Sequence, residues 1–198
     1  MSYKKSEETR SKLITTTSDL LQAKGYAAMG LNDIIKNSGI PKGSLYHHFP
    51  KGKEELASET IRFSGLQMLA SLTRLEEKTG GPAQAVAAFC SYFIDLLENS
   101  GYRRGCPLAT VALETAAGAT LVQQACSDAF QGLRDNLKNS LIKTGVAAAE
   151  AENAALMTIA TLEGALLLAK AHNDTAALAK VRDNLVVQLQ TLINKERK

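Results

Sequence analysis

The sequence predicts an all-α protein, and three observations lead to that prediction. Only four prolines interrupt the 198 residues, and alanine and leucine, both strong helix formers, dominate the composition. Apolar residues also recur at intervals of three and four along most of the chain, which is the helical period. A chain of this length buries a sizeable core. We expect about nine helices in two domains, residues 1–53 and 54–198.

The first helix is expected to begin at Ser6, as its N-cap, after a loose basic arm of residues 1–5. Glu7 and Glu8 then occupy the first turn, where the helix dipole favours acidic side chains. Gly25 ends the helix, because glycine adopts the left-handed conformation at little steric cost. The buried stripe of this helix is Leu13, Ile14, Thr17, Leu20 and Leu21.

Residues 31–49 read as two short helices joined by a tight turn. Asp33, in the first of them, can accept a hydrogen bond from the backbone N–H of Gly30 in the manner of a capping box. Gly39 ends this helix, and Pro41 suits the first position of the next one, where its missing N–H is not required.

The second short helix has a polar outer face. Leu45 and Phe49 lie four residues apart and are expected to face the core. The outward side chains are then Lys42, Ser44, Tyr46, His47 and His48. A helix, a glycine turn and a second, polar-faced helix form the helix-turn-helix pattern, whose second helix enters the major groove of DNA. We therefore predict a helix-turn-helix at residues 30–49.

The charge distribution agrees with that prediction. Residues 1–53 contain nine basic and four acidic residues, a net charge of +5, whereas the whole chain carries +3. A basic first quarter is the electrostatic footprint of a domain that binds phosphate backbones.

Five short segments of the first quarter form a recognisable set: Gly25-Tyr26, Asp33-Ile34, Ser38-Gly39-Ile40, the run Lys42–Phe49 and Lys53-Glu54-Glu55-Leu56. Over residues 6–61, this set resembles the N-terminal domain of TetR-family transcriptional repressors. A shorter match, Arg104–Leu108 through Ala112–Glu114, resembles the ligand domain of the LmrA/YxaF-like subgroup.

The resemblance implies a role for each outward residue. The expected phosphate contacts are Tyr46, His47 and Lys53, and the expected base or groove contacts are Lys42, Gly43 and Ser44. His48 either faces DNA or packs beside Phe49. Gly30 and Pro41 stand where the family often carries serine or threonine, so two hydroxyl groups that could contact DNA are missing.

Six further helices are expected, at about 53–78, 82–99, 105–114, 120–143, 150–171 and 176–194. Residues 150–171 are apolar on nearly every face and must be covered on every face. Residues 176–194 carry one narrow apolar stripe. We expect these last two helices to meet their own copy in a four-helix bundle, which makes the protein a homodimer. The resemblance implies the same dimer.

The sequence argues against a membrane or an exported protein. Glu163 and Lys170 interrupt the most apolar run, residues 154–171, which favours a buried helix over a membrane span. The charged start MSYKKSEETR carries no secretory signal. Three cysteines, Cys90, Cys106 and Cys126, are widely spaced and form no CxxC pair, as expected for reduced thiols in a cytoplasmic protein.

No catalytic or metal-binding motif is found. The chain has no GxSxG, HExxH or phosphate-binding glycine loop, and its histidines have no partners at metal-ligand spacing, so we expect no enzyme activity, metal or cofactor. Cys106 follows Arg103 and Arg104 at a helix start, so it is either a redox-sensing thiol or an inert buried one.

The resulting hypothesis is a homodimeric repressor that a small apolar ligand releases from a palindromic operator. The expected ligand pocket is lined by Phe63, Phe89, Phe93, Cys106 and Leu108. Glu114 and Glu163 are either pocket acids for a cationic ligand or partly exposed residues. The rival hypotheses are a sensing module with a vestigial DNA-binding head and, more remotely, a small enzyme that uses the C-terminal cavity.

Overall fold

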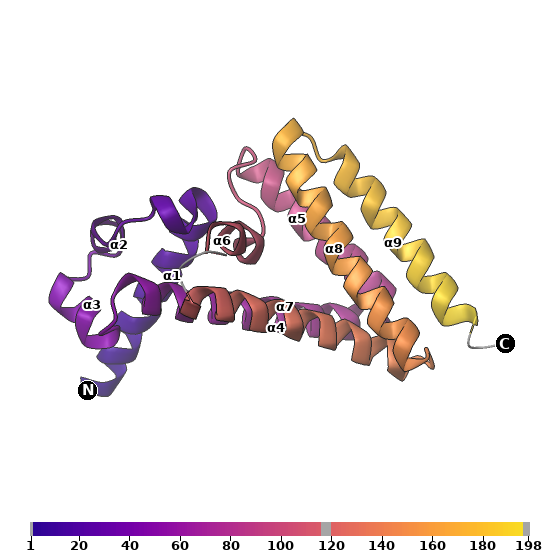
Figure 1. Ribbon diagram of the computed structural model, residues 1–198, viewed down its shortest axis with the longest axis horizontal. Coiled ribbons are helices and arrows are strands. Elements are labelled where there is room, and N and C mark those ends of the chain that lie inside the picture. The colour runs from indigo at the N-terminus through magenta and orange to yellow at the C-terminus, as the bar shows by residue number, and fades with distance from the viewer. Residues whose placement is uncertain (1, 116–119, 196–198) are drawn as a thin grey trace. The chain divides into compact units, whose positions relative to one another are not determined.

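A computed structural model describes the chain apart from residues 1, 116–119 and 196–198 (Figure 1). The described residues form nine α-helices and no strand, which confirms the predicted fold class. The helices are α1 Ser2–Ala28, α2 Leu31–Ser38, α3 Lys42–His48, α4 Lys53–Thr79, α5 Pro82–Asn99, α6 Pro107–Thr115, α7 Thr120–Lys143, α8 Ala148–His172 and α9 Ala176–Lys195.

Helix α1 corrects the expected start of the first helix. Residues 2–5 are already helical, so they form no loose arm and Ser6 is not an N-cap. The Thr9 hydroxyl donates to the Lys5 carbonyl, one turn back along this added segment. Near the other end, Gly25 has φ 74° and interrupts the helix, as the sequence predicted, before a last turn ends at Ala28.

The chain divides into two compact units. The N-terminal unit comprises residues 1–66 and 107–130, and the C-terminal unit comprises residues 67–106 and 131–198. Each unit is therefore built from two separate stretches of chain, and α4 and α7 each contribute residues to both units. The predicted domain boundary after residue 53 coincides with the start of α4 and stays a prediction.

The N-terminal unit is held by a small apolar core that α1 to α4 share with α6 and α7. Its fully buried side chains include Leu13, Leu21, Met29, Ile34, Leu45, Leu56, Ile61, Leu108 and Val122. Helix α6 packs against α1, and the Glu114 carboxylate accepts a hydrogen bond of 2.7 Å from the backbone N–H of Ala27. This bond satisfies a backbone donor just after the Gly25 kink.

In the C-terminal unit, α9 packs against both α5 and α8. The buried side chains of this unit include Phe89, Phe93, Leu97, Leu141, Leu166, Leu178, Leu185 and Leu189. Two polar contacts join α5 to the start of α9 and its preceding turn: Thr175 Oγ1 donates to Glu98 Oε1 at 2.6 Å, and Arg182 Nη1 donates to Ser91 Oγ at 3.4 Å.

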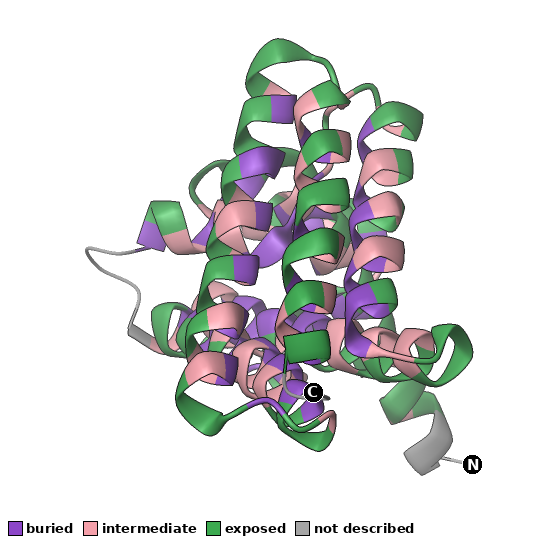
Figure 2. Cartoon of the chain, turned by 90° about the vertical axis from the view of Figure 1, so that its right-hand side faces the viewer, coloured by how far each residue is buried: buried purple, intermediate pink, exposed green. Residues whose placement is uncertain are grey.

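Helix α8 has one buried and one exposed face (Figure 2). By length and composition alone it could cross a membrane, and 33% of its most apolar window is buried. The exposed face is almost entirely apolar or small, formed by Asn153, Leu156, Met157, Ala160, Gly164, Leu167, Leu168 and Ala171. These positions follow each other at intervals of one, three and four residues, so they form one continuous stripe.

Substitution of Gly25 by alanine is expected to destabilise the protein by about 1–3 kcal/mol, because the left-handed backbone disfavours a Cβ. The new Cβ would also collide with the Glu114 carboxylate. Urea unfolding measures the loss. The control is Gly43→Ala, a helical position with no atom within 4 Å of a Cβ. Equal stability of both variants would contradict this reading of Gly25.

Candidate functional site

The turn between α2 and α3 has the geometry of a helix-turn-helix. Gly39 takes the left-handed conformation, φ 65°, and its N–H donates to the Ile35 carbonyl at 2.9 Å. The Ser38 hydroxyl accepts from the Ile40 N–H at 3.1 Å and so fixes the turn. Pro41 was predicted as the first helical residue, but it is the N-cap of α3, because its extended ψ of 148° lies outside the helix, which begins at Lys42.

The first helix of the motif is capped as expected. The Asp33 carboxylate accepts from the Gly30 N–H at 3.2 Å, and its second oxygen pairs with Lys24 at 3.4 Å. The backbone bond from Gly30, followed by the Lys24 ammonium, holds the pKa of Asp33 below its ordinary value. This residue therefore ties α1 to the start of α2.

Helix α3 is anchored by its two apolar side chains. Leu45 is fully buried and Phe49 is 1% exposed. The Arg10 guanidinium of α1 lies 5.5 Å from the centroid of the Phe49 ring, at cation–π distance. With Leu45 and Phe49 inside, the orientation of α3 about its axis is fixed.

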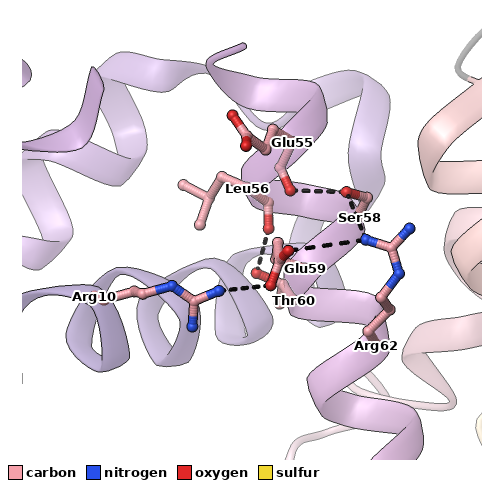
Figure 3. A network of polar contacts seen from close by, with 7 residues as sticks. All are labelled: Arg10, Glu55, Leu56, Ser58, Glu59, Thr60 and Arg62. Atoms are coloured by element: carbon pink, nitrogen blue, oxygen red, sulfur yellow. Dashed lines mark hydrogen bonds and ion pairs between the residues drawn. The ribbon is translucent and has the colours of Figure 1, made fainter. Parts of the chain in front are cut away.

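A polar network between α1 and α4 (Figure 3) positions Arg10, whose guanidinium also lies over the Phe49 ring. Arg10 Nη2 donates to Glu59 Oε2 at 2.6 Å, and Glu59 also pairs with Arg62 at 3.9 Å. Ser58 bonds the Glu55 carbonyl at 2.8 Å and accepts from Arg62 at 3.5 Å. No local sequence pattern signals this network, because Arg10 and Glu59 are 49 residues apart.

The expected DNA contacts of α3 lie on one side of this anchored helix. Lys42, Gly43, Tyr46 and His47 are exposed, and Ser44 is partly exposed. The Tyr46 ring lies against the turn before α4, since a Cβ on Gly52 would be 3.4 Å from its Cε1. Lys42 Nζ lies 6.0 Å from the centroid of the same ring. Lys42 and the Tyr46 hydroxyl thus flank one surface that carries no carboxylate of α3.

His48 has intermediate exposure, and its ring lies 6.4 Å from the Phe49 ring and 5.2 Å from the His47 ring, centroid to centroid. Burial, followed by the neighbouring charges of His47 and Arg10, lowers the pKa of His48. A lowered pKa keeps the imidazole neutral at pH 7, so His48 adds no positive charge to the surface.

Lys53 is the first residue of α4, and its side chain interacts with Tyr26 of α1 and Glu114 of α6. Its Nζ lies 4.3 Å from the centroid of the Tyr26 ring. Burial lowers the pKa of Lys53, while the Glu114 carboxylate opposes this shift. The ammonium therefore connects the end of α1, the start of α4 and the α6 carboxylate within the N-terminal unit.

The C-terminal unit contains an inner cavity with a free volume of about 40 Å³. It is lined from α4, α5, α7 and α8 by Met68, Leu72, Glu76, Pro82, Ala85, Val86, Phe89, Leu133, Asn136, Leu137, Ser140, Thr158, Ile159, Leu162 and Glu163. An open outer groove of about 360 Å³ shares Met68 and Phe89 with it and is otherwise lined by Gln67, Ser71, Arg74, Leu75, Lys78, Ala88 and Tyr92.

Of the five residues predicted to line a pocket, the structure brings Phe89 alone to these two cavities. Phe63 is 40% exposed, because Ser64 and Gly65 take the inward positions of that turn of α4. Phe93 packs edge-on against Phe89 at 5.1 Å, behind the cavity wall. Leu108 is fully buried in the N-terminal unit, and Cys106 is 3% exposed.

Among the residues that line the inner cavity, Glu163 has a clearly shifted pKa. Burial raises its pKa to about 6, and a hydrogen bond from the Cys106 thiol opposes that shift. Its Oε2 is buried without a hydrogen-bond partner. The sequence had left Glu163 open between a pocket acid and a partly exposed residue, and the structure places it on the cavity wall.

Burial also raises the pKa of the Cys90 and Cys126 thiols to about 11, which keeps both protonated at neutral pH. Across the part of the chain that the structure describes, no group of three or more potential metal-ligating side chains comes together.

Comparison with protein families matches both parts of the chain. Residues 13–60 match the model described as "Bacterial regulatory proteins, tetR family". Residues 82–184 match "Transcriptional regulator LmrA/YxaF-like, C-terminal domain".

Known relatives and solved structures agree with these matches. The uncharacterised HTH-type transcriptional regulator YxaF of Bacillus subtilis (strain 168) is 31% identical over 180 residues, 91% of this chain and 94% of its own. The HTH-type transcriptional regulator LmrA of the same strain is 34% identical over 172 residues, 86% and 92% of the two chains. A TetR transcriptional regulator from Legionella pneumophila shares the fold, with a TM-score of 0.79 at 24% identity over 89% of this chain and 94% of that one.

Replacing Glu163 by glutamine is expected to stabilise the protein at pH 7.5 by up to about 2 kcal/mol, from the rise of its pKa from 4.5 to about 6. A raised carboxyl pKa means that the folded state holds its proton more tightly, so the cost of Glu163 is absent below pH 4.5. It grows as the pH rises from 4.5 to about 6 and is fully present above that pH. The measurement is the free energy of unfolding of both proteins at pH 4 and 7.5.

Glu152→Gln is the control for this comparison, because a hydrogen bond from Lys138 lowers the pKa of Glu152. That variant should lose stability relative to the parent as the pH rises. A difference between Glu163→Gln and the parent that does not change with pH would contradict the buried state of Glu163.

Proposed function

Since the chain belongs to the TetR family of transcriptional regulators, with a C-terminal domain of the LmrA/YxaF-like type, we propose that it is a repressor released from a palindromic operator by a small apolar ligand. The family and both Bacillus subtilis relatives are transcriptional regulators and not enzymes. We expect such a regulator to act in the cytoplasm, where the DNA is.

The observation that carries the DNA-binding half of the proposal is the anchored helix α3. Leu45 and Phe49 fix its inner face, so Lys42, Gly43, Ser44, Tyr46 and His47 share the outer side. Lys42, Gly43 and Ser44, at the start of α3, are the proposed base or groove contacts. Tyr46, His47 and Lys53 are the proposed phosphate contacts, which fix the register of the helix on the duplex.

The structure bears differently on two of the proposed DNA contacts, His48 and Lys53. His48 is partly covered beside Phe49 and neutral at pH 7, so we assign it a packing role with at most a hydrogen bond to DNA. Lys53 rests on the Tyr26 ring, which leaves its charge close to the protein surface and lowers the entropy cost of a phosphate contact.

A palindromic operator follows from a two-fold symmetric dimer, and the exposed face of α8 supports such a dimer. Its apolar stripe centres on Ala160 and Gly164, two small residues that let a second helix approach closely. Exposed leucines at 156, 167 and 168 flank them, with exposed fractions of 49%, 62% and 49%. We propose that α8 and α9 of one protomer pack against the same helices of the other in a four-helix bundle.

The ligand half of the proposal is supported by the inner cavity, whose lining is mostly apolar. A ligand releases DNA only to the extent that it binds the released conformation better than the DNA-bound one.

Substituting Lys42 or Lys53 by alanine is expected to weaken binding to duplex DNA and to reduce the slope of log affinity against log salt by about one unit each. Each variant removes one positive charge from the proposed DNA-binding surface, at a phosphate contact for Lys53 and at a base or groove contact for Lys42. Fluorescence anisotropy of labelled duplexes at several salt concentrations measures the slope. Lys143→Ala removes an equal charge from an exposed position at the end of α7, in the C-terminal unit, and should leave the slope unchanged.

An unchanged slope in either variant would remove that lysine from the site. Salt-independent binding, or the same loss in all three variants, would favour the rival sensing module with a vestigial DNA-binding head.

Gly164→Leu is expected to shift the protein from dimer to monomer without unfolding it. A Cβ at Gly164 meets no atom within 4 Å in the single chain, and leucine has a higher helix propensity than glycine. The larger side chain obstructs a partner helix instead. Sedimentation velocity measures the mass, and Ala70→Leu, at an exposed position of α4, is the control. A dimer of unchanged affinity would place the interface elsewhere.

A further inference from the structure

The charged groups of the inner cavity all have the same sign. Among the residues that line it, Glu76 and Glu163 are acidic and none is basic. The rest of the wall is mainly aliphatic, with the amide of Asn136 and the hydroxyls of Ser140 and Thr158 as the remaining polar groups. Carboxylates that line an apolar cavity attract a cation.

The two carboxylates differ in how well they are satisfied. Glu76 Oε1 accepts a short hydrogen bond from the Ser140 hydroxyl. Glu163 receives a hydrogen bond from the Cys106 thiol, a weak donor, and its Oε2 is buried without a partner. A buried carboxylate oxygen without a donor costs free energy, and buried polar atoms in native structures nearly always have a partner, supplied by the protein, by water or by a bound ligand.

The aromatic side of the cavity also suits a positive charge. Phe89 lines the cavity and is 7% exposed. Phe93 meets it edge-on at 5.1 Å and Tyr92 stacks on it at 6.4 Å, so its position is fixed. The face of an aromatic ring attracts ammonium groups, most strongly where water is excluded.

We propose that the effector is an apolar molecule with a single cationic head, an alkylammonium, whose charge is neutralised by Glu163 in the inner cavity. This inference rests on the proposed function and names the chemical class of its ligand. Glu163 binds the head directly, Phe89 packs against it, and Glu76 adds a second negative charge at the same wall.

The sizes of the two spaces and the charges around them define the rest of the ligand. The inner cavity, at about 40 Å³, admits a head group and little more. The outer groove, at about 360 Å³, shares Met68 and Phe89 with it and has room for an apolar body once these side chains turn. Arg74 and Lys78 line the groove, so a second cationic group at the far end of the ligand is repelled. The effector is therefore a monocation.

The test compares two probes that differ by one atom and one charge. Butylammonium and butan-1-ol have the same chain and the same number of heavy atoms, with an NH3+ group in the first where the second has a hydroxyl. Titration calorimetry with the full chain is expected to show butylammonium binding about tenfold tighter or more, because a desolvated carboxylate stabilises the cation and accepts its N–H. In Glu163→Gln this ratio should fall close to one, whereas Glu163→Asp, which keeps the charge, should retain a preference for butylammonium.

Equal affinity of the parent protein for both probes, or binding of neither, would overturn the proposal, as would a preference that survives in Glu163→Gln. Should Glu163→Gln fail to fold, Glu76→Gln decides: loss of the second carboxylate should lower the ratio, and an unchanged ratio would contradict an acidic cavity. Binding of duplex DNA is measured in parallel with the same preparations. If the protein binds the cationic probe but no duplex DNA, the repressor function is refuted and the cation site stands. If it binds duplex DNA but shows no preference for the cationic probe, only the cation site is refuted.

Discussion

The proposed DNA-binding site depends on the burial of two side chains in a helix too short to be stable alone. Helix α3 has seven residues, well below the length at which an isolated helix forms in water. Leu45 and Phe49 supply its stability from the core, and their spacing of four residues decides which side faces outward. Arg10, held by Glu59, covers the Phe49 ring and joins this helix to α1 and α4. Every proposed base contact is positioned by this arrangement.

The N-terminal unit is not made of the first three helices alone. Helix α6, from the middle of the sequence, places Glu114 against the end of α1 and near Lys53. The Glu54 carboxylate likewise accepts from the Leu121 N–H at the start of α7. Helix α4 runs from Lys53, in this unit, to Met68, Leu72 and Glu76, which line the inner cavity of the other. The covalent path from the proposed ligand cavity to the proposed DNA-binding helix therefore includes α4, which transmits a change only if it has two arrangements that the ligand distinguishes.

The sequence predicted the features that depend on local patterns. The α2–α3 motif, the Asp33 cap, the buried Leu45 and Phe49 and the extents of the later helices all follow from spacing, glycine positions and proline positions. Of the five predicted pocket residues, Phe89 alone lines either cavity, because helical period alone does not distinguish Phe63, which faces solvent, from Ser64, which faces inward. Pairs distant in sequence, such as Arg10 with Glu59 or Glu114 with Ala27, leave no local signal. Glu163 stood out as an acid in an apolar helix, but its lack of a partner required the structure.

Selection of binding sites from a random DNA library is the most direct test of the repressor account. The purified protein, with its dimeric state confirmed, is incubated with the library at low salt, and the bound fraction is sequenced. The account predicts an enriched inverted repeat whose half-sites lie roughly one helical turn apart, ~34–36 Å, or slightly more. No enriched sequence from a folded dimer would contradict it, because α3 would then be exposed without reading DNA.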